Sequence, residues 1–445
     1  MSRVAEPALE SAAAEGQGAA PGPAGAPAHG PVEGTPLERL LARGRLRATL
    51  TMLGPAFVAA VAYVDPGNFA TNVSAGAKYG YSLMWVVLLA NLMAMLIQYL
   101  SAKLGVVTGH SLPELAHERF PRWTSWALWL QAEVMAMATD VAEFLGAAIG
   151  LNLIFGVPLL VSGLITGVIA FAILELQRRG LRSFELAIAA LLGIVFAGFL
   201  YETIKVGPSV HASLRGLIPN LHGSGALYLA VGIVGATVMP HVIYLHSALT
   251  KGRMPVRDDA ERRRVLRFER IDVLVALGLA CLINLAMLAA AAKLFHVPGL
   301  AGLDTIEGAH HELGRMVGGG AALAFAVALL ASGASSSSVG TYAGQIVMAG
   351  FINVQIPVFL RRAVTMIPAL VVLALGVSPT GALVLSQVVL SFGIPFAVIP
   401  LVVLTGHRGL MGAHVNGRLL SLLAYAIAAG ITAMNVFLIV QQLLG

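Results

Sequence analysis

The sequence predicts an all-α polytopic membrane protein. Its composition, its long apolar runs and two interruptions within those runs are the observations that predict this fold class. Hydrophobic residues make up 58% of the 445 residues and charged residues only 11%, whereas a soluble domain carries about 25% charged residues. The mean hydropathy of +0.83 points the same way. The single cysteine, Cys281, lies within an apolar run, so an intramolecular disulfide is excluded.

The N-terminal stretch differs in composition from the rest of the chain. Residues 1–36 are rich in Ala, Gly, Pro and Glu and contain no apolar segment of the signal-peptide kind. We therefore expect a disordered cytoplasmic tail at 1–36, followed by a single transmembrane domain at 37–445.

Eleven runs are long enough to span a bilayer as helices, at about 20 residues each. In chain order we expect these spans at about 49–75, 81–106, 124–151, 156–177, 183–205, 226–250, 269–296, 317–349, 357–376, 379–405 and 418–443.

The distribution of Lys and Arg predicts the orientation of these spans. Most of these residues fall at alternate ends of the spans, at 39–47, 119–122, 178–182, 251–270, 361–362 and 408–418. The opposite ends hold few, namely Lys78, Lys205, Arg215, Lys293 and Arg315. We expect the N-terminus inside and the C-terminus outside. The sequence pI near 9.6 therefore reflects loop charge and does not predict nucleic-acid binding.

The first span is interrupted by Asp65-Pro66-Gly67-Asn68. A carboxylate within a membrane helix is costly, so Asp65 is a candidate functional residue. Pro66 and Gly67 break helices, and because Pro66 lacks an N–H, the carbonyl of Ala62 loses its helical partner. A carboxylate, an amide and a freed carbonyl at one depth predict an oxygen-rich cation site in a discontinuous helix. The alternative is a kinked helix whose Asp has a structural partner.

The sixth span carries a second interruption, Ala-Thr-Val-Met-Pro-His at 236–241. Pro240 frees the carbonyl of Ala236 by the same four-residue rule, and Met239 adds a thioether. Paired interruptions in corresponding helices of two halves are typical of a transporter's binding site.

The positions of the two interruptions predict an inverted repeat. Each lies in the first span of a set of five, and an odd number of spans turns the second set upside down in the membrane. We expect one repeat at about 49–205, a second at about 226–405 and an added helix at about 418–443.

Together the two interruptions resemble the Nramp family of proton-coupled divalent metal transporters, in its bacterial, manganese-transporting form. The resemblance rests on Asp65-Pro66-Gly67-Asn68 with Met239-Pro240-His241 and extends over nearly the whole chain from about Gly54. It implies a leucine-transporter-like fold in the plasma (inner) membrane, and proton-coupled import of Mn²⁺, Fe²⁺ and similar ions by alternating access. It also implies the metal ligands: Asp65, Asn68, Met239, the carbonyls of Ala62 and Ala236, and Gln387.

The ligand chemistry agrees with that implication. Asp and Asn oxygens with carbonyls suit hard ions such as Ca²⁺ and Mg²⁺, whereas the thioether of Met239 is a soft ligand. Such a mixed site favours Mn²⁺, Fe²⁺, Co²⁺ and Cd²⁺. The alternative for Met239 is gap filling in a packed core. The metal is the transported substrate, so no cofactor is expected, and no protein partner is implied beyond metal ions, protons and the bilayer.

The third span carries three acids on one helix face, Glu133, Asp140 and Glu143, seven and three residues apart. Acids in a membrane helix are expensive unless they face a polar interior. They predict a proton route, and similar acids and arginines form the proton pathway in the Nramp family. The expected order is Asp65, Glu143, Asp140, then Glu133 with Arg361 and Arg362. The alternative is a structural ion-pair cluster.

His241 adjoins the second interruption, and we expect it to tune or share the proton of Asp65. A hydrogen-bonded core histidine explains it equally well.

Two other classes of function are weighed against metal transport. A sodium-coupled importer of small solutes uses the same fold but has no reason to place Met239 opposite an acid. An intramembrane hydrolase lacks a catalytic set, since His241 and His246 are five residues apart with no following Glu. We expect the chain not to be an enzyme.

Two polar runs receive structural interpretations. The serines at 335–338 lie between glycines and are expected to serve helix packing. The arginines at 262–264 are expected to set topology, with lipid headgroup contact as a lesser alternative.

Overall fold

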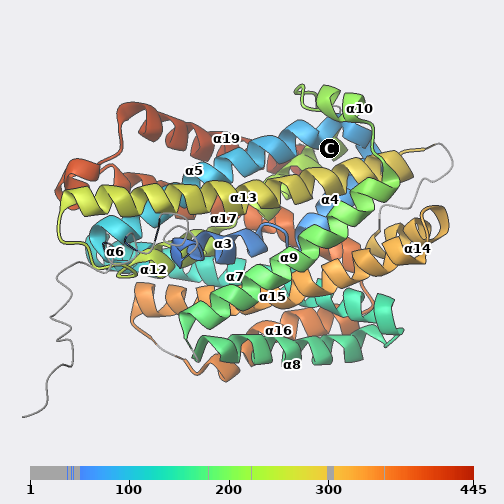
Figure 1. Ribbon diagram of the computed structural model, residues 1–445, viewed down its shortest axis with the longest axis horizontal. Coiled ribbons are helices and arrows are strands. Elements are labelled where there is room, and N and C mark those ends of the chain that lie inside the picture. Colours follow the sequence, from blue (N-terminus) through green and yellow to red (C-terminus); the bar gives the residue numbers. More distant parts are fainter. Residues whose placement is uncertain are drawn as a thin grey trace, which may run out of the picture. The chain divides into compact units, whose positions relative to one another are not determined.

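Helices make up nearly all of the part of the chain that the computed structural model describes (Figure 1). The described residues are 38, 42, 44, 51–178, 180–221, 223–297, 305–354 and 356–444. The expected N-terminal tail and the first two residues of the first span lie outside them.

The long helices correspond to the predicted spans. They are α3 (Pro55–Ala62) with α4 (Pro66–Tyr79), α5 (Met84–Thr108), α7 (Arg122–Phe155), α8 (Leu159–Arg178), α9 (Leu181–Val206), α11 (Gly223–Thr237) with α12 (Pro240–Thr250), α13 (Asp259–Phe295), α15 (Gly319–Ile352), α16 (Val358–Ala374), α17 (Pro379–Thr405) and α19 (Arg418–Leu444). Short helices fill the connections: η1 (Gly80–Leu83), α6 (Leu112–Arg119), α10 (Val210–Arg215), α14 (Ile306–Met316), α18 (Arg408–Met411) and η2 (Gly412–His414).

Eight helical segments in the described part of the chain are long and apolar enough to cross a membrane. One of them, Pro66–Thr108, joins the second half of the first predicted span to the second span. The apolar parts of α8 and α16 are shorter, at 159–173 and 363–374. A multi-pass membrane protein is thus confirmed, while the number of eleven spans stays a prediction.

The start of α13 corrects one predicted boundary. The sequence placed the seventh span at 269–296, but the helix begins at Asp259. The side chain of Asp258 caps it by accepting a hydrogen bond from the Glu261 N–H at 2.7 Å, and acids in the first turn favour the helix N-terminus. Apolar runs mark only the membrane part of a helix, so the polar first turns were missed.

Both predicted interruptions are present and are built from local sequence. Pro66 stands at the first position of α4, and Asp65 is its N-cap, accepting a hydrogen bond from the Asn68 N–H at 2.8 Å. Pro240 stands at the first position of α12, with Met239 as N-cap. Proline is favoured there because the first helical N–H has no partner in any case.

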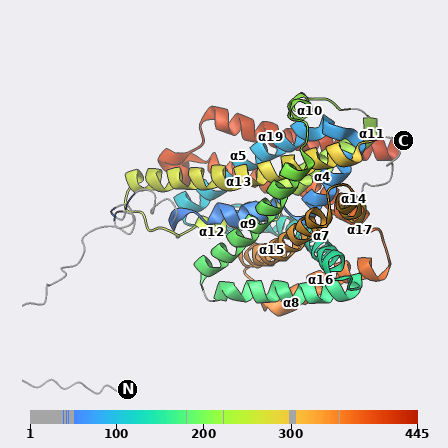
Figure 2. The same ribbon diagram turned by 45° about the vertical axis from the view of Figure 1, so that its right-hand side comes forward.

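Small residues allow α7 and α15 to pack closely. A Cβ added at Gly333 of α15 would lie 2.7 Å from the backbone nitrogen of Ala147 in α7. The hydroxyls of Ser335 and Ser338 donate to carbonyls of their own helix, at 2.6 and 2.9 Å. This arrangement agrees with the packing role expected for the serine run. The turned view of Figure 2 also shows α5 beside α13, the pairing seen in Figure 1.

We predict that Gly333→Ala destabilises the protein by about 1–3 kcal/mol, because the added methyl group must displace the α7 backbone. Gly193→Ala in α9 is the matched control, since a Cβ there meets no atom within 4 Å. Thermal unfolding in detergent measures both. Equal melting temperatures for the two variants would show that the α7–α15 contact is not tight.

Candidate metal site

The two interruptions meet through one side chain. The Asn68 amide nitrogen donates to Asp65 Oδ1 at 2.8 Å and to the carbonyl oxygen of Ala236 at 2.9 Å. Asp65 belongs to the first broken helix and Ala236 to the second. Pro240, four residues after Ala236, has no N–H to offer that carbonyl. The predicted carbonyl thus faces the other break, and Asp65, Asn68 and Ala236 are brought together as expected.

Gln387 of α17 reaches the same place across a glycine. A Cβ added at Gly67 would overlap the Gln387 side-chain amide, and one added at Gly235 of α11 would overlap the Gln387 backbone carbonyl. The amide therefore lies against the start of α4 at Gly67, which is two residues from Asp65, while the backbone of Gln387 lies against α11. Both glycines make this close approach possible.

Met239 and Ala62 lie at the breaks themselves. Met239 is fully buried at the N-cap of α12. It follows by two residues Thr237, whose hydroxyl lies 3.5 Å from Asn68 Oδ1. Ala62 is the last residue of α3, four residues before Pro66. Both residues thus stand at the edges of the two breaks, and their role as ligands stays a prediction.

The site is closed to solvent and carries oxygen atoms with no hydrogen-bond donor. Asp65, Asn68, Met239, Ala236 and Gln387 are each at most 1% exposed. Asp65 Oδ2 and Gln387 Oε1 are buried and have no hydrogen-bond partner. Most buried acceptors in proteins are satisfied, so two unsatisfied oxygens at one location are what a bound cation would complete.

The donor set is also unlike a histidine- or carboxylate-rich metal centre. Among the described residues, no three His, Cys, Asp or Glu side chains converge as a group that could hold a metal ion. The candidate site has one carboxylate, two side-chain amides, backbone carbonyls and a thioether. Such a set differs from the multi-histidine sites typical of zinc hydrolases.

A model of the Nramp family, described as natural resistance-associated macrophage protein-like, matches residues 56–441. The chain belongs to the Nramp family. It is 52% identical over 396 residues to the divalent metal cation transporter MntH of Bacillus subtilis, covering 89% of this chain and 93% of that one. The MntH of Deinococcus radiodurans is 50% identical over 400 residues, covering 90% and 92%.

Solved structures show the fold of this Nramp chain. A crystal structure of the Eremococcus coleocola manganese transporter matches with a TM-score of 0.81 and 32% identity, covering 88% of this chain and 87% of that one. Mhp1, a nucleobase-cation-symport-1 family transporter, matches with a TM-score of 0.60 at 14% identity, covering 87% and 89%, and shares the fold alone. The predicted leucine-transporter-like fold is confirmed.

The acids of the third predicted span lie on α7, which passes the candidate site. A Cβ added at Gly146 of α7 would overlap the ring of Pro66, so α7 touches the start of α4. Glu143, one turn before Gly146, is fully buried, and a Cβ at Gly340 of α15 would lie 2.9 Å from its Oε2. Asp140 is 3% exposed. Both acids are thus inside the helix bundle, as predicted.

The remaining members of the predicted route come from three helices: Glu133 from α7, His241 from α12, and Arg361 and Arg362 from α16. Arg361 of α16 pairs with Glu133, with 3.0 Å between NH2 and Oε2, and also donates to the Thr341 carbonyl at 3.3 Å. Nδ1 of His241 lies 3.4 Å from the Thr139 hydroxyl, next to Asp140. The side chain of Arg362 lies outside the described residues.

Sequence analysis missed the side chains that hold the first break in shape. The Asn284 amide of α13 donates to the Tyr63 carbonyl at 2.8 Å, and the Ser332 hydroxyl of α15 donates to the Val64 carbonyl at 2.5 Å. These carbonyls have left helical bonding, and burial in a membrane protein requires other donors for them. The only sequence signal for this role is that Asn284 and Ser332 are polar residues within apolar spans.

A further chain of polar contacts links the half-helices α3 and α12. The Nε2 of Gln98 in α5 donates to the Tyr63 hydroxyl, and its Oε1 accepts from Nδ1 of His246 at 2.8 Å. Tyr63 caps α3, and His246 lies on α12. Gln98 therefore provides a second connection between the first and second broken helices.

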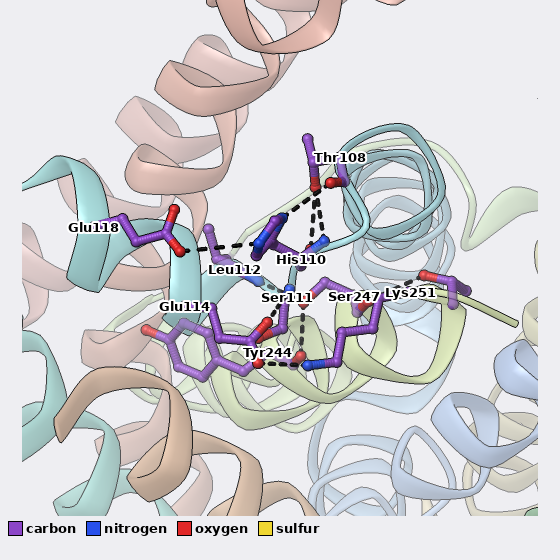
Figure 3. A network of polar contacts seen from close by, with 10 residues as sticks. Thr108, His110, Ser111, Leu112, Glu114, Glu118, Tyr244, Ser247 and Lys251 are labelled. Carbon is purple, nitrogen blue, oxygen red and sulfur yellow. Dashed lines mark hydrogen bonds and ion pairs between the residues drawn. The ribbon is translucent and has the colours of Figure 1, made fainter. Parts of the chain in front are cut away.

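The far end of α12 is held by the connecting helix α6 (Figure 3). The Leu112 N–H donates to the Ser247 hydroxyl at 2.9 Å, and Lys251 pairs with Glu114. Partial burial opposes ionisation of Glu114, but Lys251 and Ser111 outweigh it and hold the pKa of Glu114 below its ordinary value. The second half-helix is thus fixed at its last turn by charge and hydrogen bonding.

We predict that Asn284→Ala weakens metal binding by about 10- to 100-fold, the range found when a residue supporting the ligands of a metal is removed. The variant leaves the Tyr63 carbonyl without its donor, so the break relaxes around Asp65. Asn152→Ala is the control, because its amide bonds only the nearby Val157 carbonyl. Calorimetric titration with Mn²⁺ measures both. Unchanged affinity in Asn284→Ala would show that the break keeps its shape without this hydrogen bond.

Proposed function

We propose that this Nramp chain imports divalent transition-metal ions, Mn²⁺ among them, by proton-coupled alternating access. The observation that carries the proposal is the Asn68 amide, which joins the Asp65 carboxylate on one broken helix to the Ala236 carbonyl on the other. The relatives named above as divalent metal cation and manganese transporters support the same substrate class.

The present hydrogen bonds of the Asn68 side-chain amide indicate the proposed ligands. It places partial positive charge between two oxygens, Asp65 Oδ1 and Ala236 O. A divalent cation satisfies those oxygens better than an N–H group does, and rotating the amide presents Asn68 Oδ1 to the same ion. We assign Asp65, Asn68, Met239, Gln387 and the carbonyls of Ala62 and Ala236 as its ligands.

We further propose that protons leave along α7. Metal binding favours the charged form of the Asp65 carboxyl and so releases any proton held there. The pathway runs from Asp65 past His241, Glu143 and Asp140 to Glu133, with Arg361 and Arg362 at its end. The α-helical rise places Gly146, beside Pro66, about 20 Å from Glu133. The Glu133–Arg361 pair at 3.0 Å supports this ending, because it places an acid and its counter-charge together there.

Alternating access requires the half-helices to move, and their anchors are specific. The Asp272 carboxylate of α13 accepts from the N–H groups of Gly54 and Ala56, at 3.3 and 2.9 Å, at the start of α3. Beside Asp272, Glu185 pairs with both Arg253 and Arg182. Arg182 also donates a hydrogen bond to the Leu53 carbonyl at 2.6 Å. Releasing this cluster would free α3 to pivot at its break.

The orientation and organisation of the chain remain part of the proposal. We place the protein in the plasma (inner) membrane as a non-enzymatic transporter, with the N-terminus cytoplasmic and the C-terminus outside. Residues 37–445 form one transporter domain, with repeats at about 49–205 and 226–405 and an added helix at 418–443. The location of a break in the first helix of each repeat supports this division.

A sodium-coupled importer of small organic solutes is the alternative on this fold. Direct hydrogen bonds of 2.8 and 2.9 Å join the two breaks, so no space for an organic molecule lies between Asp65 and Ala236. A bare or partly hydrated ion, in contrast, needs only to take the place of the Asn68 amide N–H groups between these oxygens. The geometry therefore favours an ion over an organic solute.

We predict that Met239→Ala retains part of its Mn²⁺ transport but admits Ca²⁺ and Mg²⁺, because the remaining ligands are all oxygen. Cd²⁺ affinity should fall most, at least about tenfold, since sulfur contributes most to binding that ion. Uptake of each ion into liposomes at fixed pH measures the effect.

Met348→Ala is the control for loss of a buried thioether away from both breaks. If Met239→Ala rejects Ca²⁺ as well as the parent does, Met239 is not the selecting ligand.

We predict that Asp140→Asn binds metal with nearly normal affinity, because Asp140 is not a proposed ligand, yet loses proton movement and the pH dependence of uptake. Asp65→Asn should lose both binding and transport. Calorimetry gives the metal affinity, and paired proton and metal fluxes in liposomes give the coupling. Glu118→Gln, an exposed acid outside the membrane helices, controls for the change of charge.

Full proton flux in Asp140→Asn would make the acids of α7 a structural cluster. The proton would then leave by another route, with His241 the next group to test.

A further inference from the structure

The first turns of α13 carry a positively charged face that no ion pair neutralises. Arg263, Arg264 and Arg267 are exposed and form no ion pair or hydrogen bond with any described residue. Glu261 and Glu269 of the same stretch are buried. Asp259, one turn before Arg263, is exposed but pairs with Arg262 and lies 3.4 Å from Nε2 of His414. The exposed face from Arg263 to Arg270 is therefore basic.

The basic face continues directly into a lipid-facing one. Ile271, Leu274 and Val275 are 37%, 54% and 48% exposed on the same side of α13. Positions 263, 267, 270 and 274 are spaced by four, three and four residues, so they form a single stripe. Arg263 to Arg270 spans about 10 Å of helix, comparable to the headgroup layer of about 5–8 Å on each side of the hydrocarbon core.

Tyr99 of α5 positions the arginine nearest the apolar stripe. The Arg270 guanidinium lies 5.1 Å from the centre of the Tyr99 ring, and its NH2 donates to the Tyr99 hydroxyl at 3.2 Å. A cation–π contact orients the planar guanidinium and leaves its other N–H groups available for a bidentate anion. Tyrosine at this depth is typical of a membrane–water interface.

We propose that Arg263, Arg264, Arg267 and Arg270, with Tyr99, bind the phosphate headgroup of an anionic phospholipid. Charge complementarity selects the headgroup, and the adjoining apolar stripe selects a lipid over a soluble phosphate. The acyl chains of the bound phospholipid lie along α13 and α5, which run side by side in Figures 1 and 2. Leu274 of α13 and Leu92 of α5, 54% and 51% exposed, offer apolar surface to those chains. This site is separate from Asp65 and from the route along α7.

The test compares variants of the full chain in nanodiscs that contain phosphatidylcholine and phosphatidylglycerol in both leaflets. Spin-labelled phosphatidylglycerol measures enrichment at the protein surface over phosphatidylcholine. The triple variant Arg263→Gln, Arg267→Gln and Arg270→Gln should lose about tenfold or more of that preference. The control Arg119→Gln, Arg122→Gln and Arg408→Gln removes the same charge from exposed positions elsewhere and should keep it.

Two further variants keep the result interpretable if the glutamine triple variant fails to insert. Replacing the same three arginines by lysine keeps the charge and should keep most of the lipid preference. Tyr99→Leu also keeps the charge but releases Arg270, and should lower the preference measurably.

An equal loss in the control variant, or no loss in both the glutamine and Tyr99→Leu variants, would overturn the proposal. So would displacement of the lipid by soluble glycerol phosphate at millimolar concentration, which would identify a free phosphate site. Because lipid binding is measured without metal or flux, its outcome is independent of the transport proposal.

Discussion

The Asn68 amide bridge is the interaction on which the rest of the site depends. Two membrane helices are broken, and each break leaves backbone carbonyls without helical donors in a medium that offers little water. Asn68 satisfies one of these carbonyls, on Ala236, and at the same time caps the Asp65 carboxylate. One neutral side chain thereby holds two breaks together at the depth where a cation would be bound.

The surrounding helices complete what Asn68 begins. Asn284 and Ser332 donate to the two carbonyls that precede Asp65, and Gln98 links Tyr63 to His246 across the half-helices. Polar groups buried in a low dielectric are costly when unpaired, so each such bond fixes the local conformation. At the candidate site, Asp65 Oδ2 and Gln387 Oε1 are left without a donor.

The proposed coupling of metal and proton movements follows from the same low dielectric. A single carboxylate at the site cannot hold a metal and a proton at once. In the proposal, the acids of α7, a helix that touches Pro66, accept the released proton, and Glu133 of the same helix pairs with Arg361. The anchors of the half-helices lie elsewhere, at Asp272 for α3 and at Ser247 for α12. The residues proposed for coordination, for proton transfer and for movement thus form distinct groups.

The sequence by itself determined the features that are local along the chain. Pro66 and Pro240 fix where the helices break, since each removes one backbone donor, and the seven- and three-residue spacings place the acids of α7 on one face. Only the tertiary structure decided which side chains from other helices fill the gaps. Each of the contacts joins residues far apart in the chain. Asn68 bonds Ala236, and the Gln387 amide packs against Gly67. Asn284 and Ser332 bond the carbonyls of the first break. Such contacts depend on how closely the helices approach and how they are rotated, and helical periodicity within one segment carries no information about either.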